Sequence, residues 1–94
     1  LQAVISQQLV PTVDGKITPA FEIMLVNPAI RNLIREEKTH QIDSVIAAGS
    51  AMGMRTMDQS LYELVRSGRV AKEVALQYSI HHDALLKRFQ TEGL

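Results

Sequence analysis

The sequence predicts a mainly α fold, in which an N-terminal helix and a β-hairpin precede a bundle of four to five short helices. Apolar residues recur at helical spacing through most of residues 28–94, and Asp14-Gly15 stands between two β-capable runs. Hydrophobic residues make up 46% of the 94 residues and aromatic ones only 4%, so the core must be aliphatic. Such a core suits short packed helices and gives a single domain a modest stability margin.

The N-terminal helix is predicted over residues 1–8. Four apolar residues there have helical spacing: Leu1, Val4, Ile5 and Leu9. The pattern changes after residue 9, where the runs on either side of Asp14-Gly15 become extended. We therefore expect a helix that leads directly into the first strand of the hairpin.

The hairpin is predicted to close with a two-residue turn that pairs Val13 with Lys16. Pro11 and Pro19 cannot donate to a strand ladder, which favours edge positions for both strands. The second strand continues through residues 21–26, beyond the reach of the first. Residues 21–26 are therefore expected to lack a strand partner.

Four further stretches carry helical apolar stripes after the hairpin and the helix that follows it. Thr39 is predicted to cap a helix from His40 to Ala48 that stops at Gly49. Thr56 and Gln59 form a capping box for a helix that ends near Arg66, before Ser67-Gly68. The remaining stripes predict helices near residues 70–78 and in the tail; they consist of Val70, Ala71, Val74, Ala75, Tyr78, Leu85, Leu86 and Phe89.

The composition excludes several functions. Ten basic residues balance ten acidic ones, which disfavours nucleic-acid binding. The chain has no cysteine, so it holds neither a disulfide nor a cysteine-based zinc site, and a reducing cytoplasm fits. No apolar run approaches the ~20 residues of a membrane span. Because the sequence begins with Leu1 inside a periodic pattern, we interpret it as a fragment of a longer protein.

The sequence shows no recognisable motif for nucleotide binding, acid–base catalysis or metal binding. There is no GxxxxGK[ST] loop to cradle a triphosphate, so the chain alone is expected to lack ATPase activity and a nucleotide cofactor. The acidic residues show no spacing that would place two carboxylates around a substrate, so no catalytic residue is assigned. His81 and His82 are adjacent and would point about 100° apart on a helix, so no metal site is expected.

The strongest functional signal lies in residues 27–36. Asn27 is a suitable N-cap and Pro28 a suitable first helical residue. On the helix that follows, the apolar and polar residues separate onto two faces. The apolar face consists of Ala29, Ile30, Leu33 and Ile34, and the polar face of Arg31, Asn32, Arg35 and Glu36. Two guanidinium groups one turn apart destabilise an isolated helix slightly, which suggests that this face binds something; a solvated helix surface is the simpler alternative.

These eight residues, Ala29 to Glu36, read AIRNLIRE, and this motif resembles the signature of type IV pilus retraction ATPases, the PilT-like motors. Residues 49–58 look like the GGSLGMQTLD-type segment of that family, and residues 4–9 like the end of its RecA-like core. The resemblance assigns residues 1–27 to the end of that ATPase core and residues 28–94 to the C-terminal helical region. It also marks Arg55 as a candidate contact residue, although this family often has Gln there.

The resemblance implies a parent protein that forms a hexameric ring at the cytoplasmic face of the inner membrane. That parent would use ATP and Mg to drive pilus disassembly and twitching motility, with its nucleotide-binding motifs upstream of this chain. Residues 29–36 and Arg55 would then contact a neighbouring subunit or a protein of the pilus machinery. The chain alone is expected to form dimers, by strand pairing or domain swapping, through residues 21–26 or its first helix.

Two alternatives stay open. The first is a fragment of a pilus extension or type II secretion ATPase. Those ATPases commonly carry a four-cysteine insert after the equivalent of residues 7–11, and its absence here favours the retraction branch. The second is a stand-alone helical interaction module, for example a helix-turn-helix over residues 40–66, which the neutral charge and the hairpin disfavour.

Overall fold

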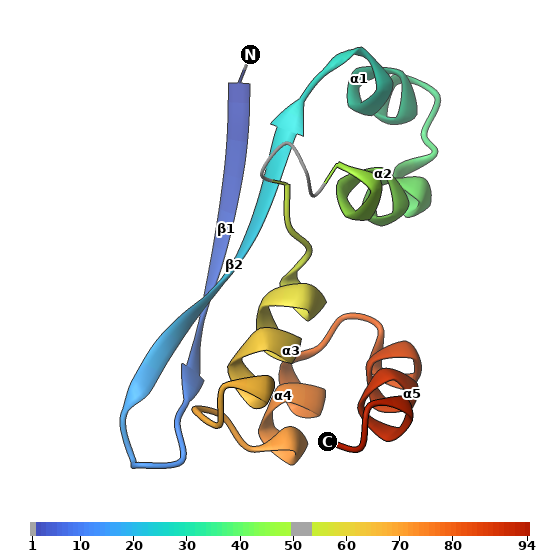
Figure 1. The fold of residues 1–94 in the computed structure, drawn as a ribbon. Helices are drawn as coiled ribbons and strands as arrows, with labels where there is room; N and C mark the ends of the chain where they lie inside the picture. The colour runs from blue at the N-terminus through green and yellow to red at the C-terminus, as the bar shows by residue number, and fades with distance from the viewer. Residues whose placement is uncertain (1, 50–53) are drawn as a thin grey trace. The chain divides into compact units, whose positions relative to one another are not determined.

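The computed structural model describes residues 2–49 and 54–94 and shows a β-hairpin followed by short helices (Figure 1). The elements in chain order are β1 (Gln2–Pro11), β2 (Ile17–Val26), α1 (Pro28–Arg35), the 3-10 helix η1 (Thr39–Gln41), α2 (Ile42–Ala48), α3 (Met57–Arg66), α4 (Lys72–Tyr78) and α5 (His82–Thr91). The predicted class, a hairpin followed by a set of short helices, is confirmed.

The predicted helix over residues 1–8 is wrong, because these residues belong to strand β1. β1 and β2 are ten residues each and form a two-stranded sheet, so residues 21–26 do have a strand neighbour, contrary to the prediction. Val4, Ile5 and Leu9, whose spacing suggested a buried helical face, are 47%, 63% and 53% exposed. A helix there would gain no buried apolar contact, whereas strand pairing provides hydrogen-bond partners for the backbone N–H and C=O groups of both segments.

The hairpin closes with a three-residue loop, not with the predicted two-residue turn. The Thr12 N–H donates to the Lys16 carbonyl at 2.9 Å, and the Gly15 N–H donates to the Thr12 carbonyl at 3.2 Å. Gly15 has φ +82°, a left-handed conformation that glycine adopts without a steric penalty. This combination is the usual three-residue hairpin connection, so the closing pair is Thr12 and Lys16 in place of Val13 and Lys16.

The chain divides into two compact units, each of which takes residues from both strands. One unit contains residues 7–20 and 57–94. Its buried cluster joins residues near the hairpin loop to α3, the α3–α4 connection, α4 and α5: Val10, Ala20, Met57, Leu61, Tyr62, Val70, Ala75, Leu85 and Phe89. α3 ends at Arg66 as predicted, and Gly68 follows with φ +79°. The apolar stripes predicted for the last two helices therefore contribute to the core of this unit through Val70, Ala75, Leu85 and Phe89.

The other unit contains residues 21–56 together with the start of β1. Ile30 of α1 and Ile46 of α2 are fully buried there, and Met54 is 4% exposed. The predicted Thr39 cap is wrong: residues 39–41 form the 3-10 helix η1, no side chain caps it, and α2 begins only at Ile42. α2 ends as predicted, with Gly49 as its C-cap.

Candidate functional site

The start of α1 matches its sequence prediction. The Asn27 Oδ1 accepts a hydrogen bond from the Ile30 N–H at 2.9 Å, and Asn27 itself has an extended backbone with φ −125° and ψ 176°. Pro28 occupies the first turn, where its missing N–H costs no helical hydrogen bond. Local sequence therefore fixes where the helix of the signature motif begins.

The end of α1 is a Schellman motif built on a residue other than glycine. The Glu37 N–H donates to the Ile34 carbonyl at 3.2 Å, and the Lys38 N–H donates to the Leu33 carbonyl at 2.8 Å. Glu37 has φ +57°, the one positive φ among the non-glycine residues that the structure describes. The left-handed conformation costs such a residue about 1–2 kcal/mol, so the end of the signature helix is strained.

The apolar face of α1 is narrower than predicted. Ile30 is fully buried and Leu33 is half-buried, but Ala29 is exposed and Ile34 is 50% exposed. α1 is only eight residues long and packs on η1 and α2, so its contact covers little more than one turn. The prediction that all four apolar residues are buried is therefore wrong for Ala29 and Ile34.

The polar face of α1 is exposed, as the sequence predicted. Arg31, Asn32, Arg35 and Glu36 all lie at the surface, with Glu36 as the C-cap residue. Glu36 also forms an ion pair with Lys38 at 3.4 Å, in which both side chains are more than half exposed. Across the described ranges 2–49 and 54–94, neither Arg31 nor Arg35 takes part in an ion pair. The exposed side of α1 thus combines two guanidinium groups with Ala29 and the apolar side chain of Ile34.

Arg55 lies in the same compact unit as α1, two residues before α3 begins at Met57. Its backbone forms an isolated antiparallel bridge with Ile23 of β2. The Ile23 N–H donates to the Arg55 carbonyl at 2.8 Å, and the Arg55 N–H donates to the Ile23 carbonyl at 2.9 Å. Arg55 is half-buried, so the structure gives it a backbone role on β2 that its charge did not predict.

Two features of the other unit were missed from the sequence. The Arg88 guanidinium lies 3.6 Å from the centre of the Tyr62 ring, a cation–π contact between α5 and α3, and it donates a hydrogen bond to Gln59. The residues are 26 and 29 positions apart, so no local spacing signals the contact. The second missed feature is a pocket at the hairpin loop, described below.

No group of three metal-ligating side chains occurs within the part of the chain that the structure describes. His82 instead places its Nδ1 3.1 Å from the Leu76 carbonyl oxygen. None of the helices in residues 2–49 and 54–94 is both long and apolar enough to cross a membrane.

The comparisons with known proteins agree with the signature motif. The chain is 58% identical over 76 residues to a Neisseria gonorrhoeae protein named twitching motility protein, and this match covers 80% of the chain and 20% of that protein. It is 48% identical over 75 residues to the Pseudomonas aeruginosa protein named type IV pilus retractation ATPase PilT, a match that covers 80% of the chain and 22% of the relative. No family model matches the sequence.

A comparison of the backbone with solved structures gives the same result as the comparison of sequences. The chain matches a crystal structure described as the pilus retraction motor PilT with bound ADP, with a TM-score of 0.73 and 40% identity over 93% of the chain and 24% of that structure. Sequence and fold thus both match proteins that are named for pilus retraction or twitching motility. The chain belongs to the family of PilT-like type IV pilus retraction ATPases, and it spans about a fifth of the length of the curated relatives that it matches.

Proposed function

We propose that this chain is the C-terminal portion of the ATPase domain of a motor that powers type IV pilus retraction and twitching motility. The observation that carries the proposal is the 58% identity to the twitching motility protein over 80% of the chain. The absence of cysteine supports the retraction branch over ATPases with a four-cysteine insert. Residues 1–27 would complete a RecA-like core, and residues 28–94 would form the region that couples ATP hydrolysis to pilus disassembly.

The chemistry of this motor would come from outside the chain. No phosphate-binding loop occurs among its 94 residues, so ATP and Mg would bind to motifs elsewhere in the parent protein. The chain alone should neither bind nor hydrolyse ATP. Calorimetry with the 94-residue chain tests this expectation, and saturable binding at micromolar ATP would contradict it.

The exposed face of α1 is the surface that we propose for coupling. Arg31 and Arg35 present two guanidinium groups beside the half-exposed Ile34, and Arg55 lies in the same unit. Guanidinium groups bind carboxylates in a bidentate geometry, so an acidic surface on a neighbouring subunit or a pilus-machinery protein would be a suitable partner. The parent would act as a hexamer in the cytoplasm, associated with the inner membrane through that machinery.

The decisive experiment replaces Arg31 and Arg35 together by Ala in the full-length parent. Twitching motility should be lost while the melting temperature is unchanged, because both side chains are exposed. A matched control replaces Lys87 and Arg66, which are also exposed and lie in the other unit. Normal motility in the Arg31/Arg35 variant would show that this face is only a solvated surface. A large drop in the melting temperature of the variant would show that the arginines have a structural role.

The dimer expected for the chain alone stays a prediction, with a changed site. Residues 21–26 already pair with β1, and the predicted first helix does not exist. Within the described residues, β1 has a strand neighbour on one edge only, and the side chains of Val4, Ile5 and Leu9 on β1 are exposed. An unpaired apolar edge favours strand pairing, so dimers of the chain alone should form through β1. Sedimentation of the chain and of an Ile5→Lys variant would test this.

A further inference from the structure

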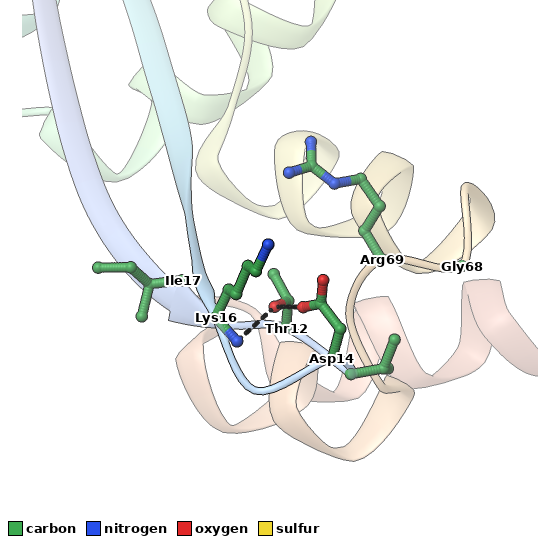
Figure 2. A pocket seen from close by; sticks show the side chains of 7 residues that line it. Thr12, Asp14, Lys16, Ile17, Gly68 and Arg69 are labelled. Carbon is green, nitrogen blue, oxygen red and sulfur yellow. Dashed lines mark hydrogen bonds between the residues drawn. The ribbon is translucent and has the colours of Figure 1, made fainter.

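The hairpin loop and the connection between α3 and α4 form an open pocket of about 270 Å³ (Figure 2). Both walls belong to the same compact unit, residues 7–20 and 57–94. The Val13 N–H donates to the Arg69 carbonyl at 2.9 Å, and this hydrogen bond joins the loop to the helical connection. The pocket therefore has one wall from the hairpin and one from residues 68–69, and a backbone hydrogen bond joins the two walls.

Backbone N–H groups of the loop are already used within the fold, among them those of Val13, Gly15 and Lys16. The Gly15 N–H donates to the Thr12 carbonyl, and the Lys16 N–H donates to the Thr12 Oγ1 at 3.1 Å. The Thr12 hydroxyl donates in turn to the carboxylate of Asp14, as Figure 2 shows. A phosphate site at a loop needs several backbone N–H groups that point outward, and this loop has used its own. The acidic side chain of the pocket is likewise engaged within the loop.

Two cations and two apolar side chains are left to face a ligand. Lys16 and Arg69 line the pocket; in the described part of the chain neither forms an ion pair within 4.0 Å, and the charge of Arg69 acts on the Asp14 carboxyl group only as a minor contribution. Val13 and Ile17 also line it and are 65% and 63% exposed. A guanidinium group beside exposed aliphatic side chains can contact an acidic group and an apolar group of one partner at the same time. The complementary surface is a carboxylate with an aliphatic residue beside it.

We propose that this hairpin-loop pocket binds a partner protein through a segment in which Glu or Asp lies next to an aliphatic residue. The Arg69 guanidinium accommodates the carboxylate, the Lys16 ammonium adds a second positive charge, and Val13 and Ile17 contact the aliphatic side chain. A protein partner fits better than a phosphorylated ligand, because the loop offers side-chain cations without a set of free N–H groups. The inference is independent of the proposed motor function, since it rests only on this unit.

The test is a titration of the isotopically labelled 94-residue chain, followed by amide NMR. The probe is a six-residue peptide of alternating Glu and Leu with blocked ends, compared with the same peptide carrying Gln in place of Glu and with inorganic phosphate. The variant Lys16→Gln/Arg69→Gln removes both charges, and Lys87→Gln/Arg66→Gln removes the same number of exposed charges elsewhere. The dispersion of each spectrum shows whether the variant is folded.

We expect saturable shifts at the amides of residues 12–17 and 68–69 with the acidic peptide. Its dissociation constant should rise at least about tenfold in the Lys16/Arg69 variant and stay unchanged in the control variant. The proposal is overturned if the acidic peptide does not saturate these shifts, if the Gln peptide or phosphate binds as tightly, or if the Lys16/Arg69 variant binds normally.

Discussion

Asp58 on α3 holds the start of α5 through the backbone of His81. Its Oδ2 accepts a hydrogen bond from the His81 N–H at 2.8 Å, and its Oδ1 accepts one from the Ile80 N–H at the same distance. His81 is the N-cap residue of α5, and no side-chain hydrogen bond of its own caps that helix. A carboxylate from another helix therefore accepts hydrogen bonds from the two backbone N–H groups that immediately precede α5 and anchors the start of that helix.

The first prediction concerns this pair. Asp58→Ala should lower the free energy of unfolding by about 1–2 kcal/mol, because two charge-assisted hydrogen bonds are lost at a partly exposed site. Asp83→Ala removes the same charge from an exposed position in α5 and should cost no more than about 0.5 kcal/mol. Urea unfolding of both variants measures the difference, and equal stabilities would show that the cap contributes nothing.

The second prediction concerns the strained end of α1. Glu37→Gly should raise the free energy of unfolding by about 0.5–1 kcal/mol, since glycine removes the left-handed penalty at φ +57° but gains entropy in the unfolded chain. Glu36→Gly, one residue earlier at φ −89°, removes the same side chain without any such relief and should destabilise the protein. Thermal melting of the two variants should show shifts of opposite sign; a lower melting temperature for Glu37→Gly would contradict the strain.

The third prediction ranks the positions of α1 by burial. Ile30→Asp places an unpaired carboxylate in a fully buried site and should cost several kcal/mol, enough to unfold a small domain. Leu33→Asp should cost clearly less, because Leu33 is half-buried, although the sequence placed it on the apolar face with Ile30. The Arg31→Ala/Arg35→Ala variant should change stability by no more than about 0.5 kcal/mol. Circular dichroism melts give this order, and a reversed order for positions 30 and 33 would refute it.

The fourth prediction follows from the hairpin loop. The Thr12 hydroxyl, which donates to the carboxylate, is the main reason why the pKa of Asp14 lies below its ordinary value of 3.8. A carboxyl group with a lowered pKa in the folded state adds stability above its unfolded pKa, and this contribution is lost as the pH falls through the folded pKa. Thr12→Val should therefore raise the pKa of Asp14 toward 3.8 and weaken the acid dependence of hairpin stability.

An NMR titration of the Asp14 carboxyl carbon measures this pKa directly in both proteins. Thr12→Ser keeps the hydroxyl and should keep the low pKa, which makes it the matched control. An unchanged pKa in Thr12→Val would assign the shift to the smaller contributions, which are the backbone N–H groups of Lys16 and Asp14 and the charge of Arg69.

The sequence predicted the structure correctly where the deciding interactions join residues that are close in the chain. Asn27 and Pro28 fixed the start of α1, Gly49 marked the end of α2, and the stop near Arg66 was placed correctly, because caps and glycine act within a few residues. The polar face of α1 was predicted for the same reason. The three-residue loop was missed because Asp14-Gly15 is compatible with either turn, and the Thr12 side chain decides between them.

Errors arose where partners distant in sequence decide the structure. Residues 1–8 carry a helical spacing, yet pairing with β2 makes them a strand, and the side chains that suggested a buried face remain exposed. The exposure of Ile34 also follows from what α1 packs against, which its own periodicity does not contain. The contacts of Asp58 with Ile80 and of Arg88 with Tyr62 span more than 20 residues and leave no local pattern.

The distribution of the two units along the chain limits how the protein can be divided. The polypeptide passes from one unit to the other at residues 6–7, 20–21 and 56–57. A protease cut near residue 56 therefore divides one unit, because residues 57–94 are released while residues 7–20 stay covalently attached to the other unit through both hairpin strands, and no single truncation yields either unit by itself. Any force applied to one unit reaches the other along β1 and β2 as well as along the segment that precedes α3, so the hairpin strands are a mechanical tether in parallel with that segment.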